Sequence, residues 1–249
     1  MILRRVIQHV RDQNWTAVGI DFVIVVVGVF LGIQLGNWNA ARADRAEYGR
    51  ALERFDAEVV ANLATLDDLD DEVEGRLERA RDGFAALRTC EETEANREAV
   101  NRSLNTLVGT HGLHLRRSAL DELTSDPALL AQQSAAERQR LADLLFTFEM
   151  MAREAIISEF YPQEGRFENN PLIGIGAPRE GAFTFYGAEF TTVAYPLSLQ
   201  VPIPEACRDN DLIKSYRTWL FWQGNVPTAF QAVRSELQET QTLLSEATP

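Results

Sequence analysis

Residues 17–36 read AVGIDFVIVVVGVFLGIQLG, and this stretch decides the fold because it is too apolar for a helix surrounded by water. Only Asp21 among these residues is charged. At 1.5 Å per residue, a helix of this length covers roughly 30 Å, the thickness of the hydrocarbon core of a bilayer. Trp15 and Trp38 lie on either side, and indole rings prefer the headgroup region. We therefore predict a transmembrane helix over residues 15–38 with these two tryptophans as interface anchors.

Two other interpretations of the apolar stretch stay open. A buried helix of a soluble protein has a similar composition, although tryptophans at both ends favour a membrane. A cleaved signal peptide would explain Arg4 and Arg5 before the apolar run and the small-x-small pattern Ala41-Arg42-Ala43 after it. The length of the apolar run and of the segment before it favours a retained anchor.

The orientation of the span follows from the N-terminal segment and from the cysteines. Residues 1–14 contain three arginines among apolar residues at helical spacing, which predicts a basic amphipathic tail on the cytoplasmic leaflet. Lys and Arg are nearly balanced across the span, but long domains are translocated largely regardless of charge. A disulfide between Cys90 and Cys207 would require an oxidising compartment. We predict a single-pass protein of the bacterial inner (plasma) membrane, with a cytoplasmic N-terminus and the bulk of the chain in the periplasm.

Glycines recur every four residues within the span, at Gly28, Gly32 and Gly36. Small residues at this spacing let another helix approach closely. Asp21 lies seven residues before Gly28, near the same face, and a carboxylate at membrane depth usually faces protein or water. This pattern indicates a packing face with a proton-responsive group, or an aspartate hydrated at the cytoplasmic interface. The expected partners are the lipid bilayer and either a second copy or another membrane protein.

Beyond the span, apolar residues recur in steps of three and four from Leu52 to Leu87. This spacing predicts one long amphipathic helix, continuous with the membrane helix. Its apolar stripe fits either an intermolecular coiled coil or the inner face of a bundle within one chain, and we favour the bundle. The predicted fold class is mainly α, with an extramembrane helical bundle over residues 39–162.

The last third of the chain changes character twice. Residues 163–206 contain five prolines and extended runs such as FTFYG and TTVAY, which predicts a loop-rich segment with short strands. Residues 207–249 return to helical spacing, with a break at 224–227, and are expected to pack on the bundle. Three pairs have the spacing of a capping box at a helix start: Thr89 with Glu92, Ser118 with Asp121, and Ser134 with Glu137.

Composition and motifs exclude several functions. A net charge of −13 argues against nucleic-acid binding, and we attribute the abundance of arginine to genome composition. No catalytic or cofactor motif occurs, so we expect neither an enzyme nor a cofactor. His111 and His114 lie in a glycine-flanked loop, which is a poor frame for a metal site. A disulfide between Cys90 and Cys207 would tie the end of the long helix to the loop-rich segment.

The run GIDFVIVVVGVFLGIQLGNWN at residues 19–39 resembles the N-terminal signature of a family of uncharacterised bacterial single-span membrane proteins, a domain of unknown function. In that family an acidic residue, usually Glu, opens an apolar run that ends in Gln and then Trp-Asn. The matching positions here are Asp21, Gln34, Trp38 and Asn39. Residues 116–149 resemble the family's second block. The resemblance implies an anchored, helical, extracytoplasmic protein with no assigned activity.

Three functions fit this layout. The first is a membrane-anchored periplasmic module that binds or scaffolds a partner. The second is a proton-responsive energy-coupling subunit that uses Asp21 together with a membrane partner. The third is a periplasmic ligand sensor, which would need a membrane partner to carry its signal.

Overall fold

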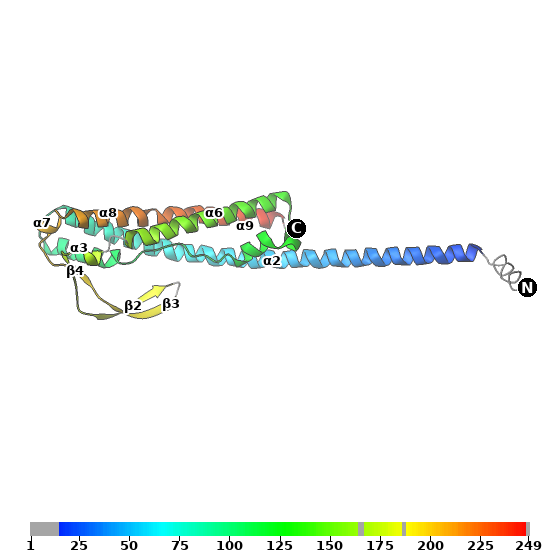
Figure 1. The fold of residues 1–249 in the computed structure, drawn as a ribbon, viewed down its shortest axis with the longest axis horizontal. Coiled ribbons are helices and arrows are strands. Elements are labelled where there is room, and N and C mark those ends of the chain that lie inside the picture. Colours follow the sequence, from blue (N-terminus) through cyan, green and yellow to red (C-terminus); the bar gives the residue numbers. More distant parts are fainter. Residues whose placement is uncertain (1–14, 164–166, 186–187, 248–249) are drawn as a thin grey trace, which may run out of the picture.

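The computed structural model describes residues 15–163, 167–185 and 188–247. The predicted cytoplasmic tail, residues 1–14, lies outside them. The described chain is mainly α, as predicted, with a few short strands before the last helices. Figure 1 shows an elongated bundle from which one long helix projects toward the N-terminus.

The projecting helix is α2, Trp15–Arg88, which runs for 74 residues or about 110 Å. Residues 22–40 are exposed on every side, whereas from Ala51 onward the helix buries one face. Among the described residues, α2 is the helix that is long and apolar enough to cross a membrane. The apolar segment and the first bundle helix are therefore one element, and its packing against the other helices reaches back to Tyr48, which donates a hydrogen bond to Glu137.

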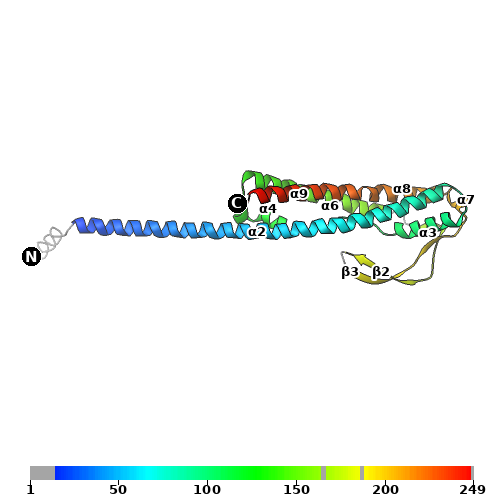
Figure 2. The ribbon, with the colours of Figure 1, turned by 180° about the vertical axis from the view of Figure 1, so that it is seen from behind.

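The remaining helices pack along the second half of α2 (Figures 1 and 2). They are α3 (Glu94–Leu107), α4 (Ser118–Ser125), α5 (Pro127–Gln132), α6 (Ala135–Phe160), α8 (Asn210–Gly224) and α9 (Val226–Ala247). α2 contacts α3, α8 and α9, and α6 packs on α9. The apolar stripe of α2 lies inside this bundle, where Val59, Leu66 and Leu77 are fully buried. Each such side chain contributes about 1.5–3 kcal/mol by leaving water.

The helix starts only partly follow the predicted capping boxes. Ser134 and Glu137 form the expected reciprocal box at the start of α6. The other two predictions are wrong. Thr89 lies just beyond the end of α2, and α3 is capped by Thr93 instead. No side chain at the start of α4 caps it; the carboxylate of the distant, buried Glu58 accepts hydrogen bonds from the backbone N–H groups of Ala119 and Leu120.

The loop-rich segment forms two antiparallel pairs of short strands. β1 (Ile173–Ile175) pairs with β4 (Leu197–Leu199), and β2 (Arg179–Phe185) pairs with β3 (Ala188–Ala194). Two 3₁₀ turns, Tyr161–Gln163 and Phe167–Asn169, precede the strands, and α7 (Ile203–Ala206) follows them. The β2–β3 hairpin leaves the bundle at the end far from the N-terminus and turns back beside it (Figures 1 and 2).

Candidate functional site

The N-terminal, apolar half of α2 packs against no other helix among the described residues. A Cβ added at Gly28, Gly32 or Gly36 would meet no atom within 4 Å. Trp38 is 61% exposed, and the guanidinium of Arg42 lies 5.9 Å from the centre of its ring. Trp15 and Asp21 belong to α2, but their side chains lie outside the described part of the structure. The predicted packing face is thus open to a neighbouring helix.

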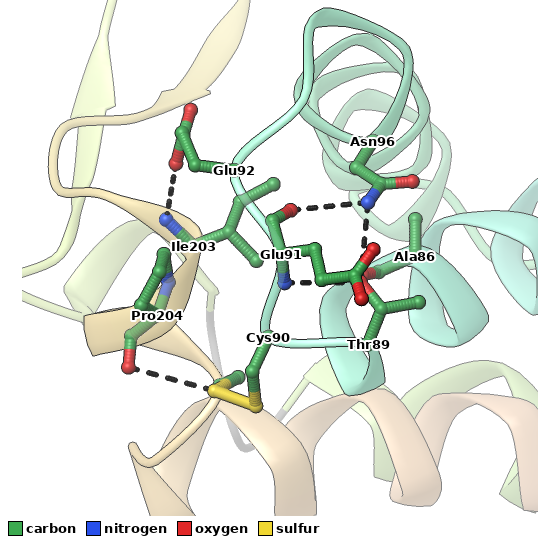
Figure 3. The surroundings of a disulfide bond; sticks show 9 residues. Ala86, Thr89, Cys90, Glu91, Glu92, Asn96, Ile203 and Pro204 are labelled. Carbon is green, nitrogen blue, oxygen red and sulfur yellow. Dashed lines mark hydrogen bonds between the residues drawn. A yellow bond between two sulfur atoms is a disulfide. The ribbon is translucent and has the colours of Figure 1, made fainter.

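The two cysteines, 117 positions apart in sequence, meet in a disulfide with a Cα–Cα distance of 5.4 Å. Figure 3 shows its surroundings: the disulfide joins the end of α2 to α7. A second link lies beside it, since the Glu92 carboxylate accepts a hydrogen bond from the backbone N–H of Ile203 at 2.6 Å. The end of the bundle far from the N-terminus is therefore fastened both covalently and by hydrogen bonds.

The two loop histidines face different carboxylates. His111 Nε2 lies 3.3 Å from Glu72 Oε1, and His114 Nε2 lies 3.4 Å from Glu159 Oε2. Burial lowers the pKa of His111, the charge of Arg76 lowers it further, and Glu72 opposes both. The backbone around His111 is held by Gln223, whose side chain bonds both the N–H and the C=O of His111. The structure thus assigns His111 to the packing of the loop onto the bundle.

A cleft of about 740 Å³ opens between α3 and the root of the β2–β3 hairpin. One wall is the face of α3 that carries Arg97, Asn101 and Asn105, which recur every four residues. The opposite wall comes from the turn before β2 and from the start of β4, and Arg79 of α2 joins the lining. Secondary-structure elements far apart in sequence therefore build the cleft together.

Side chains of α3 hold β4 in place as a neighbouring strand would. Asn105 accepts from the N–H of Leu197 at 2.8 Å and donates to its C=O at 2.9 Å. Asn101 accepts from the N–H of Leu199 at 2.9 Å, and Arg97 donates to the C=O of Leu199 at 3.1 Å. Because these bonds satisfy the outer edge of β4, the position of the strand, and with it one wall of the cleft, is set by α3.

Comparisons with protein-family models, with curated proteins and with solved structures found no match to this chain. Membership of the family that the span resembles therefore stays a prediction from the sequence.

Reasoning from the sequence missed the cleft, because arginine was attributed to genome composition. The four-residue spacing of Arg97, Asn101 and Asn105 was the one local signal. The buried polar groups of α2 were missed as well: Asn62, 2% exposed, bonds both the N–H and the C=O of Arg116. Their partners lie more than 50 positions away, so no local pattern identifies them.

Proposed function

We propose that the protein is a single-pass protein of the bacterial inner membrane whose helical bundle lies in the periplasm and binds or scaffolds a partner. The main supporting observation is that the exposed surface of α2 changes along the helix, from apolar on all sides to apolar on one buried face. Phe22, Phe30 and Leu35 are 68%, 59% and 64% exposed in a segment whose apolar side chains point in all directions. A helix that is apolar on all sides belongs in a protein core or in a bilayer. No packed neighbour covers this segment among the described residues, which favours lipid.

The layout gives the proposed module a stalk. Residues 39–47 separate Trp38, the proposed interface anchor, from Tyr48, which packs against the core. As a helix these nine residues extend about 14 Å. A bundle on such a stalk would stand clear of the headgroups, where a soluble or membrane-bound partner can reach its sides.

The disulfide supports the proposed orientation. Cys90 and Cys207 close a bond at the end of the bundle far from the span, and such bonds persist in the periplasm but are rare in the cytosol. The short N-terminal segment would then remain inside. This arrangement agrees with the orientation expected from the sequence.

Reporter fusions at the C-terminus test the topology. We expect alkaline phosphatase, which requires an oxidising compartment, to be active there and green fluorescent protein to stay dark. The reverse pattern would refute the proposal. An epitope tag at the N-terminus tests retention of the anchor: the tag should remain on the membrane-bound chain, and a mature protein that begins at Asp44 would contradict it.

The proposed partner in the bilayer is a second copy of the chain, with Gly28, Gly32 and Gly36 at the contact. Crosslinking in native membranes tests this. Gly32→Leu places bulk on the glycine face and should reduce a crosslinked dimer severalfold, whereas Val23→Leu adds bulk on the opposite face and should not. A dimer equally abundant in both variants, or no dimer in the wild type, would count against a contact through this face.

A further inference from the structure

The cleft beside α3 concentrates positive charge in an acidic protein. Its lining contains four arginines and two glutamates, whereas the whole chain has a net charge of −13. Two of the arginines are compensated: Arg97 pairs with Glu92 at 2.6 Å, and Arg102 pairs with Glu98 at 2.8 Å. The charge that remains in the cleft is carried by the other two arginines, with only Glu94 left against them.

These two arginines, Arg79 and Arg179, form no ion pair with any residue that the structure describes. Arg79 reaches the cleft from α2, where its Nε lies 3.4 Å from the hydroxyl of Thr106. Arg179 reaches it from the first position of β2. Both side chains are solvent-accessible, so water and a ligand can compete for their N–H donors.

A third guanidinium lies close to Arg79, outside the lining of the cleft. Arg76 lies one helical turn or less away on α2, and its guanidinium pairs with Glu72 at 3.6 Å. Burial has the largest effect on the pKa of Arg76 and lowers it, the charge of Glu72 raises it, and the charge of Arg79 lowers it by the smallest amount. A group of guanidinium ions that repel one another is stabilised by an added anion, because the anion offsets the repulsion.

We infer that the cleft binds a small anion with at least two acidic groups, carboxylates or phosphates, through Arg79 and Arg179. Guanidinium groups bind both kinds of oxyanion through paired N–H donors, and a volume of about 740 Å³ is ordinary for a small-molecule site. The walls are firm where the ligand would sit, since Asn101 and Asn105 fasten β4 to α3. This inference gives a ligand class to the binding module proposed above and rests on that proposal for its biological setting.

Calorimetric titration of the full chain in detergent micelles at low ionic strength tests the inference. The probes are citrate, for carboxylates, and inorganic pyrophosphate, for phosphates, with acetate at matched ionic strength as the control. We expect saturable binding of at least one probe and none of acetate. Arg79→Gln and Arg179→Gln should each weaken that binding about tenfold or more, the range expected for a lost hydrogen bond to a charged group.

Arg81→Gln is the matched control. Arg81 lies on α2 two positions beyond Arg79, its side chain is 56% exposed, and it pairs with Glu74 outside the cleft. The Arg81→Gln substitution removes the same charge from the protein and should leave the affinity for the anion probe within twofold of the wild-type value. Absence of saturable binding, or equal affinities for wild type, Arg79→Gln and Arg179→Gln, would overturn the inference and leave the anchor proposal intact. A cytosolic reporter would refute the anchor without affecting the titration.

Discussion

At the scale of single residues, Cys90 combines two roles. It lies two residues beyond the end of α2 and has a φ of 56°, in a region that favours glycine. It is also half of the disulfide to Cys207. The positive φ at Cys90 is unfavourable for a residue with a Cβ, and the disulfide at the same residue stabilises the end of the bundle.

Two double variants separate these roles. Cys90→Ser with Cys207→Ser should lower the free energy of unfolding of the bundle by about 2–5 kcal/mol, because a long closed loop is released in the unfolded chain. Cys90→Gly with Cys207→Ser loses the same bond but should be more stable than the serine pair by about 1 kcal/mol, because glycine adopts positive φ readily. Urea unfolding followed by circular dichroism measures both.

Addition of a reductant serves as the control for this series. It should destabilise the wild type by as much as the serine pair and leave both double variants unchanged. Equal stability of the serine and glycine pairs would show that the backbone conformation at position 90 carries no cost.

The burial of His111 leads us to predict that the free energy of unfolding depends on pH. Its pKa in the folded protein is lowered, chiefly by burial and next by Arg76, so the folded chain prefers the neutral imidazole. The unfolded chain takes up the proton near its ordinary pKa of 6.5. The stabilisation is therefore complete above that pH and is lost as the pH falls through the lower folded value.

Substitution of this histidine isolates its contribution. His111→Gln removes the titrating group, so the loss of stability between pH 7.5 and pH 5 should be smaller than in the wild type. Unfolding curves at several pH values measure the difference, and His114→Gln is the control because its side chain lies at 56% exposure. Parallel pH profiles for wild type and His111→Gln would refute the assignment.

At the scale of elements, two glycines of α2 have opposite roles. A Cβ at Gly83 would lie 1.9 Å from the hydroxyl of Ser103 and 2.9 Å from the backbone C=O of Ala99, so α3 packs against bare backbone here. A Cβ at Gly75 would meet only Arg79, at an ordinary 3.5 Å. The first glycine permits close packing of two helices, and the second has no such reason to be glycine.

The same substitution should therefore act with opposite signs at the two positions. Gly83→Ala should destabilise the bundle by about 1–3 kcal/mol, because α3 must move away. Gly75→Ala should stabilise it by about 0.5–1 kcal/mol, because alanine restricts the unfolded chain. Urea unfolding of both variants measures this, and a destabilised Gly75→Ala or a neutral Gly83→Ala would contradict the packing described for α2 and α3.

At the scale of the whole molecule, α2 divides into a part that supports the bundle and a part that does not. Ala43 and Ala64 are both exposed alanines of this helix, one in the stalk and one in the bundle. Proline removes a helical hydrogen bond at either place. Ala64→Pro should cost about 3 kcal/mol or more. Ala43→Pro should leave the unfolding free energy of the bundle unchanged and bend only the stalk.

Thermal or urea unfolding of the full chain in micelles, followed by tryptophan fluorescence, compares the two proline variants. The buried Trp219 in α8 reports on the bundle. Equal destabilisation by both prolines would mean that the stalk and the bundle unfold as one unit.

Several features followed from the sequence alone because their causes are local. The apolar run at residues 17–36 and the stripe from Leu52 to Leu87 are repetitions within one segment, and burial of apolar surface follows such patterns directly. The proline-rich break before the last helices and the capping box of Ser134 with Glu137 are local in the same sense. The mainly helical fold, with one long helix that begins with an apolar segment, was therefore predictable from the sequence.

Only the tertiary structure decided which distant residues meet. Three features join positions that lie about 60 to 100 residues apart. They are the cap of α4 by Glu58, the hydrogen bonds from Asn101 and Asn105 to β4, and the cleft that contains Arg79 and Arg179. Hydrogen bonds and charges act over a few ångströms and carry no periodicity along the chain, so their partners become known only when the bundle brings them together. The hydropathy pattern of the sequence determined the helical architecture, whereas the residues that line the cleft are known only from their proximity in the folded chain.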